Sequence, residues 1–219
     1  MKVRKMNMNN KEMNILVTIP PNNILYLKTM LLSLFENNNN ILINIFLLHS
    51  FIPEKDIRDL NKFVLKYQNK LFVYRVDEEI FKFAPLYRNC SVEIYYRLAA
   101  MKYLPQNIDK VLYLDVDIII NKSLLELYNM EFNDKYFIVC EDTNHSKKNK
   151  EVYDILNIPY EYPYFNSGVM VMNLKLLREN NQYERILKFM HGDWLIKNKY
   201  FHDQNILNAL FFKDVRLCR

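Results

Sequence analysis

Short apolar runs alternate along the chain with longer stretches in which apolar residues recur at helical spacing. The short runs are bounded by proline, asparagine or charged residues, which is typical of buried strands. We predict strands at residues 15–19, 41–48, 71–76, 110–120, 136–140 and 164–173. We predict helices at residues 25–35, 53–67, 91–104, 181–198 and 203–211, the third with Ser91 as its N-cap and Pro105 as its stop. Strands that alternate with helices indicate an α/β domain with a largely parallel sheet.

The same pattern sets the expected domain organisation. Residues 1–13 are polar, basic and rich in methionine and asparagine, and we expect a disordered tail there. Residues 14–219 contain no linker and no internal repeat, so we expect one domain. Ligands of parallel sheets bind at the carboxyl ends of the strands. We therefore expect the ligand-binding residues of this domain at the ends of its predicted strands.

The strongest candidate for chemistry lies in residues 110–121. Asp115 and Asp117 interrupt an apolar run and would share one face of a strand, because strand side chains alternate. Two carboxylates at the end of a buried strand repel each other unless a cation lies between them. Mg²⁺ or Mn²⁺ held by one or two carboxylates keeps positions open for phosphate oxygens, so the pattern indicates a nucleotide-diphosphate site. The other interpretation is a solvated strand end with two unconnected acids, because D-x-D patterns also arise by chance.

Composition narrows the alternatives. The chain has 219 residues, is half hydrophobic, carries a net charge of +5 and contains only two glycines, Gly168 and Gly192. A glycine-rich phosphate loop is therefore excluded, and a metal and side chains would have to neutralise bound phosphates. The basic excess is spread along the sequence, which argues against a nucleic-acid partner. It suits an enzyme that handles phosphates or lies near an anionic membrane surface.

Cysteine usage and hydropathy predict the compartment. Cys90, Cys140 and Cys218 are odd in number, far apart and without C-x-x-C spacing, so we expect reduced thiols. No run of 18 apolar residues and no signal-peptide pattern is present. We therefore expect a cytoplasmic protein.

Further polar residues stand at predicted element ends. Arg97 lies among apolar and aromatic neighbours, so its charge needs a partner, either an aspartate of the motif or a sugar or phosphate group. Asp142 follows a predicted strand together with Glu141, and one of the two acids is a candidate ligand contact. His49 also follows a strand, where a structural role is more common than a ligand role.

Two later segments add candidates. Asn166 precedes Gly168 at the start of a predicted strand, where a glycine allows close backbone approach and an amide can bind hydroxyl groups. Asp203 and Gln204 belong to the run His202-Asp-Gln-Asn that opens the last helix. One residue suffices to cap a helix, so four polar residues in succession indicate additional contacts.

Five blocks of residues, taken in order, resemble glycosyltransferase family 8. They are Asn14-Ile-Leu-Val-Thr, Tyr95-Tyr-Arg-Leu, Lys110-Val-Leu-Tyr-Leu-Asp-Val-Asp, Tyr164-Phe-Asn-Ser-Gly-Val-Met-Val-Met-Asn-Leu and His202-Asp-Gln-Asn-Ile-Leu-Asn. This family comprises retaining enzymes, among them bacterial lipopolysaccharide galactosyl- and glucosyltransferases. The resemblance implies a GT-A fold, with a Rossmann-like, mixed but mainly parallel sheet flanked by helices. It also implies a UDP-sugar donor, Mn²⁺ or Mg²⁺ as cofactor, and a glycan or lipid-linked sugar acceptor, and it leaves peripheral contact with the inner face of the membrane open.

The resemblance assigns roles to individual residues. Asp115 and Asp117 become metal ligands, and Asp203 and Gln204 lie beneath the anomeric carbon as catalytic residues. The remaining assignments are contacts to the donor: Arg97, Asp142 and Asn166 for the sugar, Thr18 and Asn22 for the nucleotide, and Asp115 and Val116 for the sugar or the nucleotide.

The chain departs from the family pattern at two places. Pro20-Pro21 stands where the family commonly carries a polar or acidic residue, and Asn23 where a ring often stacks on uracil, so base recognition is expected to differ. The family's third metal ligand, a histidine, and a lysine that meets the diphosphate belong to a later segment. We therefore expect a C-terminally truncated chain, in which residues 214–217 form a strand cut short.

The expected reaction is transfer of glucose or galactose from UDP to an acceptor hydroxyl with retention at the anomeric carbon. Double displacement and a front-face route are both compatible with the sequence. Two other classes compete with this prediction. One is a metal-dependent nucleotidyltransferase or phosphohydrolase, which would need a phosphate loop or further clustered acids. The other is a catalytically incomplete domain that binds nucleotide-sugar without turning it over.

Overall fold

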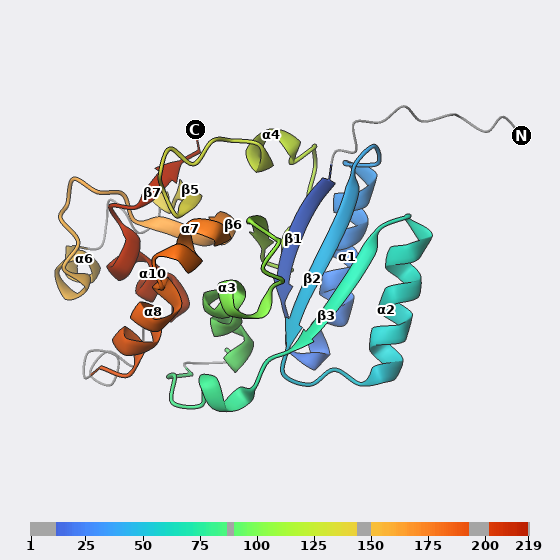
Figure 1. Ribbon diagram of the computed structural model, residues 1–219, viewed down its shortest axis with the longest axis horizontal. Coiled ribbons are helices and arrows are strands. Elements are labelled where there is room, and N and C mark those ends of the chain that lie inside the picture. Colours follow the sequence, from blue (N-terminus) through green and yellow to red (C-terminus); the bar gives the residue numbers. More distant parts are fainter. Residues whose placement is uncertain (1–11, 87–89, 144–149, 193–201, 219) are drawn as a thin grey trace, which may run out of the picture.

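The computed structural model describes residues 12–86, 90–143, 150–192 and 202–218, and a seven-stranded sheet forms its centre (Figure 1). The strand order across the sheet is β3-β2-β1-β4-β6-β5-β7. The strands are β1 (Glu12–Thr18), β2 (Leu42–His49), β3 (Lys70–Arg75), β4 (Lys110–Leu114), β5 (Phe137–Glu141), β6 (Phe165–Asn173) and β7 (Val215–Leu217).

Strand direction confirms the predicted fold class. β1 pairs in parallel with both β2 and β4, β2 pairs in parallel with β3, and β5 pairs in parallel with β7. Among the strands of the described residues, β6 alone runs against its neighbours β4 and β5. The sheet is thus mixed and mainly parallel.

Helices cover both faces of the sheet. The α-helices are α1 (Ile24–Glu36), α2 (Glu54–Lys66), α3 (Ala100–Tyr103), α4 (Leu125–Tyr128), α6 (Lys150–Leu156), α7 (Leu174–Glu179), α8 (Gln182–Met190) and α10 (Asp203–Phe211). The 3₁₀ helices are η1 (Pro21–Asn23), η2 (Glu78–Ile80) and η3 (Val92–Ala99). In the described part of the chain no helix is long and apolar enough to cross a membrane.

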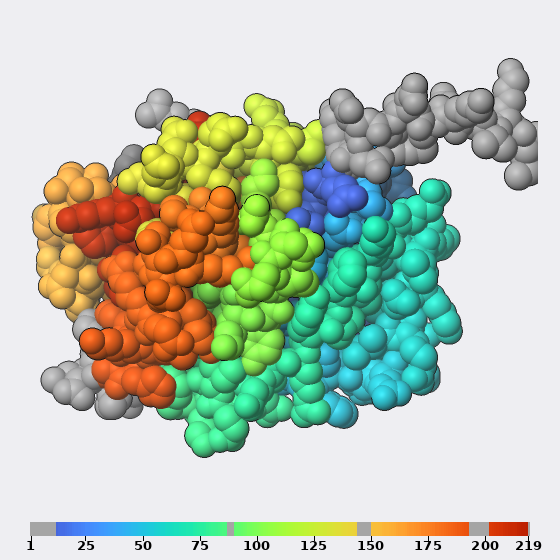
Figure 2. All heavy atoms as spheres, in the orientation of Figure 1, coloured from blue at the N-terminus to red at the C-terminus, as the bar shows by residue number. Residues whose placement is uncertain are grey.

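Alternation along the strands produces two cores. Ile15 and Val17 of β1 pack with α1 and α2, whereas Leu16 packs on the opposite face with η3, α7, α8 and α10. β4 follows the same rule, because successive side chains of a strand point to opposite faces. Figure 1 shows α1 and α2 beside β1–β3, and Figure 2 shows the surface formed by α3, α7 and α8. Burial on both faces explains why the strand sequences are continuous apolar runs.

The structure moves several predicted boundaries. β1 begins at Glu12, inside the segment expected to be a tail, because Met13 is buried and pairs with Ile43 of β2. Residues 1–11 lie outside the described residues, as do residues 193–198 of the predicted helix at 181–198. The strand expected at the end of the sequence is present as β7.

The helix predicted at residues 91–104 differs in type. It is divided into the 3₁₀ helix η3 and the single turn α3, and the Ser91 side chain makes no capping hydrogen bond. Glu93 and Arg97 of η3 are both buried in this segment. A 3₁₀ helix of this length is uncommon and often marks a functional segment.

The prediction that the strand continues through the D-x-D pattern is wrong. β4 ends at Leu114, and Val116 and Asp117 form a turn. The alternation argument therefore does not apply to Asp115 and Asp117. The physical reason is that the Asp115 N–H donates to the carbonyl of Gly168 at 2.8 Å as the last ladder bond to β6, after which the chain leaves the sheet.

The prediction of reduced thiols is wrong for two of the three cysteines. Cys140 of β5 and Cys218, directly after β7, form a disulfide, while Cys90 is free. These strands are parallel neighbours, which brings residues 78 positions apart to a Cα–Cα distance of 5.4 Å. Spacing in the sequence carries no sign of this neighbourhood.

Candidate active site at the carboxyl edge of the sheet

A cavity of about 590 Å³ opens at the carboxyl ends of β1 and β4, beside η3. Six predicted site residues line it: Thr18, Asn22, Arg97, Asp115, Val116 and Asp117. Three chain segments that are distant in sequence meet here, because β1 and β4 are adjacent parallel strands and η3 packs against β1 and β2. The expectation that ligand residues gather at this edge agrees with the cavity's position.

Arg97 is the centre of the polar contacts. Its Nη2 lies 3.0 Å from Asp115 Oδ1 and its Nε lies 3.1 Å from Asp203 Oδ2, so one buried guanidinium joins two carboxylates. Nη1 donates to the carbonyl of Ser167 at 2.8 Å. Burial by itself lowers the pKa of Arg97, but attraction by Asp203, with smaller contributions from Tyr113 and Asp115, raises the pKa above its ordinary value. The charge is thereby maintained in a desolvated place.

Asp115 is held in one orientation. Its Oδ1 accepts hydrogen bonds from Arg97 at 3.0 Å and from the Tyr113 hydroxyl at 2.7 Å. A Cβ placed on Gly168 would lie 2.5 Å from Asp115 Oδ2, so only glycine leaves room for this carboxylate. The orientation of the Asp115 side chain thus depends on the absence of a side chain at Gly168 of β6.

The two aspartates suit a divalent cation that is shared with a ligand. Among the described residues no hydrogen bond reaches Asp115 Oδ2 or the exposed carboxylate of Asp117, although both residues line the cavity. The same part of the chain contains no group of three or more His, Cys, Asp or Glu side chains that could hold a metal. Mg²⁺ or Mn²⁺ bound by two carboxylates with ligand oxygens and water fits this set.

A second group of polar residues lies beyond Arg97 at the start of β6 and α10. The Gln204 Oε1 accepts from the Ser167 N–H at 3.0 Å, and its Nε2 donates to Asp142 Oδ2 at 3.1 Å. Asp203 is 6% exposed, and its Oδ2 accepts from the Ser167 hydroxyl at 3.3 Å. Burial raises the pKa of Asp203, and Arg97 opposes this rise.

The run His202-Asp-Gln-Asn therefore has more than a capping role. The Asn205 Oδ1 accepts from the His202 N–H at 3.1 Å, which completes the cap of α10. Asp203 and Gln204 instead reach across to Arg97, Ser167 and Asp142. The expectation that these polar residues make contacts additional to the cap is confirmed.

Not every predicted residue lines the cavity. Asp142, Asn166, Asp203 and Gln204 belong to the second group, which is connected to the cavity through Arg97. Asn166 is exposed and its Oδ1 accepts from the Gly168 N–H at 2.8 Å. His49 is buried at the end of β2 and does not line the cavity. Its pKa is lowered, mainly because it is buried and to a smaller extent because the positive charge of Arg75 lies nearby.

Sequence reasoning missed three residues of this site. Tyr26 is 60% exposed and lines the cavity from the first turn of α1, three positions after the asparagine where a stacking ring was sought. Tyr113 orients Asp115. Glu93 lines the cavity although it is 4% exposed, and as a charge inside an apolar helix it carried the same signal that identified Arg97.

Solved structures with this fold define the class of protein. The chain matches a galactosyltransferase, LgtC, solved in complex with donor and acceptor sugar analogs, with a TM-score of 0.84 and 26% identity over 94% of this chain and 73% of that one. A structure of an active-site mutant of LgtC matches with a TM-score of 0.85 and 25% identity, again over 94% and 73%. The fold is therefore the GT-A fold of nucleotide-sugar transferases.

The sequence then places the chain within that class. The model of glycosyl transferase family 8 matches residues 14–217, and the chain belongs to this family. A lipopolysaccharide 1,2-glucosyltransferase of Escherichia coli is 31% identical over 185 residues, which are 84% of this chain and 54% of that protein. A putative glycosyltransferase of Haemophilus influenzae is also 31% identical, over 84% of this chain and 55% of its own length. The chain spans about half the length of these curated relatives, and the predicted family is confirmed.

Proposed function

We propose that this protein transfers a hexose, glucose or galactose, from a UDP-sugar to an acceptor hydroxyl, with retention at the anomeric carbon. The acceptor class is lipopolysaccharide or another cell-surface glycan, which is supported by similarity to a lipopolysaccharide 1,2-glucosyltransferase of Escherichia coli and a lipopolysaccharide 1,3-galactosyltransferase of Salmonella typhimurium. The single observation that carries the proposal is the position of Asp115 and Asp117 on the cavity, with Arg97 forming ion pairs to both Asp115 and Asp203.

The order of strands supports a layout for the donor. The cavity lies at β1 and β4, and the group that contains Gln204 lies at β6, the next strand in the sheet. A nucleotide-sugar is a linear molecule, so a diphosphate at Asp115 and Asp117 would place its sugar toward Ser167 and Gln204. Arg97 lies between these two places and contacts both.

Asp115 and Asp117 would hold Mn²⁺ or Mg²⁺, and the cation supplies Lewis-acid stabilisation of the departing diphosphate. Arg97 and the Tyr113 hydroxyl orient Asp115 through its Oδ1 and leave Oδ2 open. Ser167 and Asp142 fix the Gln204 amide from both sides, so that it is positioned before substrate arrives. Preorganised dipoles of this kind stabilise charge that develops in a transition state.

The contacts of Asp203 favour the front-face route over double displacement. A nucleophile needs an accessible oxygen, but Asp203 is buried and its Oδ2 is shared by Arg97 and Ser167. An amide such as that of Gln204 is a poor nucleophile. We therefore assign Asp203 to positioning Arg97, and the acceptor's proton to the leaving phosphate oxygen.

Calorimetric titration of UDP with Mn²⁺, and again with EDTA, tests the proposal. We expect binding that requires Mn²⁺ and that weakens at least about tenfold in Asp117→Asn, because a carboxylate ligand is lost. Asp134→Asn is the matched control, since Asp134 is exposed in the turn before β5 and its positive φ of 60° suits asparagine. Equal binding in EDTA would contradict the metal assignment.

A turnover assay separates the two functional alternatives. Release of UDP from UDP-glucose or UDP-galactose in the presence of an acceptor glycan would support the transferase. Mn²⁺-dependent binding of UDP without any sugar release or transfer would instead support a domain that binds nucleotide-sugar without turnover.

A further inference from the structure

Glu93 is a buried carboxylate that the proposed mechanism does not use. It lies on η3 four residues before Arg97, is 4% exposed, and still lines the cavity. The Ser50 hydroxyl donates to its Oε1. Within the described residues no ion pair involves Glu93 and no hydrogen bond reaches its Oε2. A buried carboxylate with one oxygen still open is costly, so a donor supplied by a ligand would satisfy it.

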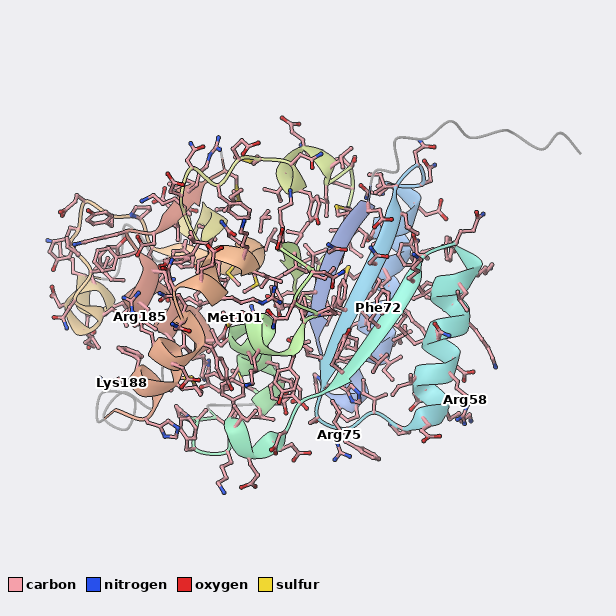
Figure 3. The ribbon with its side chains drawn as sticks, in the orientation of Figure 1. Arg58, Phe72, Arg75, Met101, Arg185 and Lys188 are labelled. Carbon is pink, nitrogen blue, oxygen red and sulfur yellow. A yellow bond between two sulfur atoms is a disulfide. The ribbon has the colours of Figure 1, made fainter. Side chains whose placement is uncertain are left out.

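Nearby cations have other partners. Arg75 ends β3 at the same edge of the sheet, where Figure 3 labels it, and its Nε donates to the Ser50 carbonyl at 2.9 Å rather than to Glu93. Arg97 is committed to Asp115 and Asp203. The Glu93 charge is therefore not neutralised by a described salt bridge, and a diphosphate close to it would be repelled.

The sheet order indicates which part of a nucleotide-sugar Glu93 would meet. Ser50 directly follows β2, and the strands then run β2-β1-β4-β6 across the sheet. Asp115 and Asp117 follow β4, while Ser167 and its partner Gln204 lie at β6. Glu93 and the group at β6 are thus on opposite sides of the aspartate pair. With phosphates at the pair and the sugar toward β6, the nucleoside lies on the side of Glu93.

We propose that Glu93 is a specificity-determining residue that accepts a hydrogen bond from the nucleoside, either from the ribose 2′-hydroxyl or from the imide N–H of the base. This inference rests on the proposed function, because it requires that UDP occupies the cavity. Ser50 holds Oε1, which leaves Oε2 as the acceptor. A charged acceptor in a buried site discriminates strongly against analogues that lack the donor, because its own oxygen is then left unpaired.

The experiment compares the binding of UDP and two analogues in the presence of Mn²⁺. The analogue 2′-deoxy-UDP lacks the 2′-hydroxyl, and 3-methyl-UDP lacks the imide N–H. We expect the wild-type protein to bind one analogue about 10- to 100-fold more weakly than UDP. In Glu93→Gln the Ser50 hydroxyl would still occupy the amide oxygen, which turns an N–H donor toward the ligand. The ratio of the Kd of that analogue to the Kd of UDP should then fall to less than about threefold. The analogue that responds identifies the donor group.

Glu54→Gln is the matched control, because the Glu54 side chain is 90% exposed on α2, and it should keep the wild-type ratio. Equal binding of all three ligands by the wild-type protein overturns the proposal without any variant, even if Glu93→Gln does not fold. A wild-type ratio that persists in folded Glu93→Gln overturns it as well. Absence of UDP binding by the wild-type protein is a different result, since it overturns the proposed function and this inference together.

Discussion

Arg97 shows how much of this site depends on one side chain. It is buried between Asp115 and Asp203, and its guanidinium stacks on the Tyr113 ring at 4.1 Å from the ring centroid. A planar guanidinium can satisfy several acceptors at fixed angles, which a lysine ammonium cannot. Removing one member of a buried ion pair costs about 3–5 kcal/mol, because the remaining charge is left uncompensated. Here two carboxylates would be left.

Asp203 gives a pH-dependent prediction. Burial, opposed by Arg97, raises its pKa above the ordinary value of 3.8. A raised folded-state pKa means that the folded protein binds the Asp203 proton more tightly than the unfolded chain does. Protonation of Asp203 therefore favours the folded state. This contribution to the free energy of unfolding is complete below the unfolded pKa and is lost as pH rises through the folded pKa. In Asp203→Asn this titration is absent. As pH rises above 3.8, the free energy of unfolding of the wild-type protein should therefore fall relative to that of Asp203→Asn. The expected change is about 1.4 kcal/mol per pH unit until the folded pKa is passed.

Urea unfolding of both proteins across this pH range measures the difference, and all groups common to the two proteins cancel. The attraction between ionised Asp203 and Arg97 is already contained in the folded-state pKa of Asp203, so it is part of this slope and adds no separate contribution. A difference independent of pH would show that Asp203 titrates as an exposed aspartate.

Gly168 gives a steric prediction. In Gly168→Ala the new Cβ would lie 2.5 Å from Asp115 Oδ2, and Asp115 cannot turn away without losing Arg97 or Tyr113. We expect the free energy of unfolding to fall by about 1–3 kcal/mol, as overpacking typically costs. Mn²⁺-dependent binding of UDP, measured by calorimetry, should weaken at least about tenfold as the metal ligand moves.

Gly192→Ala is the control for this variant. Its Cβ would meet the Phe189 carbonyl oxygen at 3.2 Å and no residue of the site, so UDP binding should be unchanged. UDP binding by Gly168→Ala that equals wild-type binding would contradict the prediction. It would mean that Asp115 can move away from the new Cβ without losing its function as a metal ligand.

At the scale of elements, the ends of β1, β4 and β6 decide where chemistry is possible. β4 stops at Leu114, and the turn that follows presents Asp115 and Asp117 at the cavity. β6 runs against its neighbours, so its first residues lie beside the end of β4, where Asp115 N–H still bonds to Gly168. One antiparallel strand thus brings Ser167 and Gly168 to an edge that otherwise collects carboxyl ends.

The disulfide between Cys140 and Cys218 gives a prediction for the edge strands β5 and β7. It closes a loop with a sequence separation of 78 residues, for which loop entropy predicts a stabilisation of about 4.5 kcal/mol, whereas measured values are typically about 2–4 kcal/mol. Cys218→Ser should lower the free energy of unfolding in urea by about 2–4 kcal/mol under oxidising conditions. Dithiothreitol should lower the wild-type protein to the level of the variant.

Cys90→Ser serves as the control, because Cys90 is free and the disulfide remains intact. It should retain the response to dithiothreitol that Cys218→Ser loses. The disulfide would be contradicted by wild-type unfolding that is the same with and without reductant.

At the scale of the whole molecule, the two faces of the sheet have different tasks. α1 and α2 cover one face with an apolar core, while the other face carries η3 and α10, whose buried charges reach the site. Figure 1 shows α1 and α2 beside β1–β3, and α10 near β6. A ligand at the carboxyl edge would contact segments from both halves of the chain, so binding should stabilise the entire domain rather than one element.

Thermal unfolding tests this expectation. A ligand that binds only the folded state at 100 times its Kd stabilises it by about 2.7 kcal/mol, so UDP with Mn²⁺ should raise the melting temperature. UDP with EDTA and Mn²⁺ alone are the controls and should produce much smaller shifts. An equal shift with EDTA would mean that UDP binds without the aspartate pair.

Much of the fold was predictable because it depends on local pattern. Continuous apolar runs predicted β1, β2, β3, β5 and β6, and helical spacing predicted α1, α2 and α10. α7 was missed although Asn173 caps it by accepting from the Leu176 N–H at 3.1 Å, because no element was predicted between the strand that ends at residue 173 and the helix from residue 181. α6, packed by Val152 and Tyr153, lacked a pattern long enough to identify a helix.

The sequence by itself determined the fold class, the family and the residues that carry charge at element ends, because propensity, periodicity and motif order are properties of neighbouring residues. Only the tertiary structure decided that Arg97 joins Asp115 to Asp203, that Gly168 makes room for Asp115, that Cys140 meets Cys218, and that Glu93 lines the cavity. The physical reason is the same in each case. Such contacts depend on which strands are adjacent and where each one ends, and these depend on packing across the whole domain.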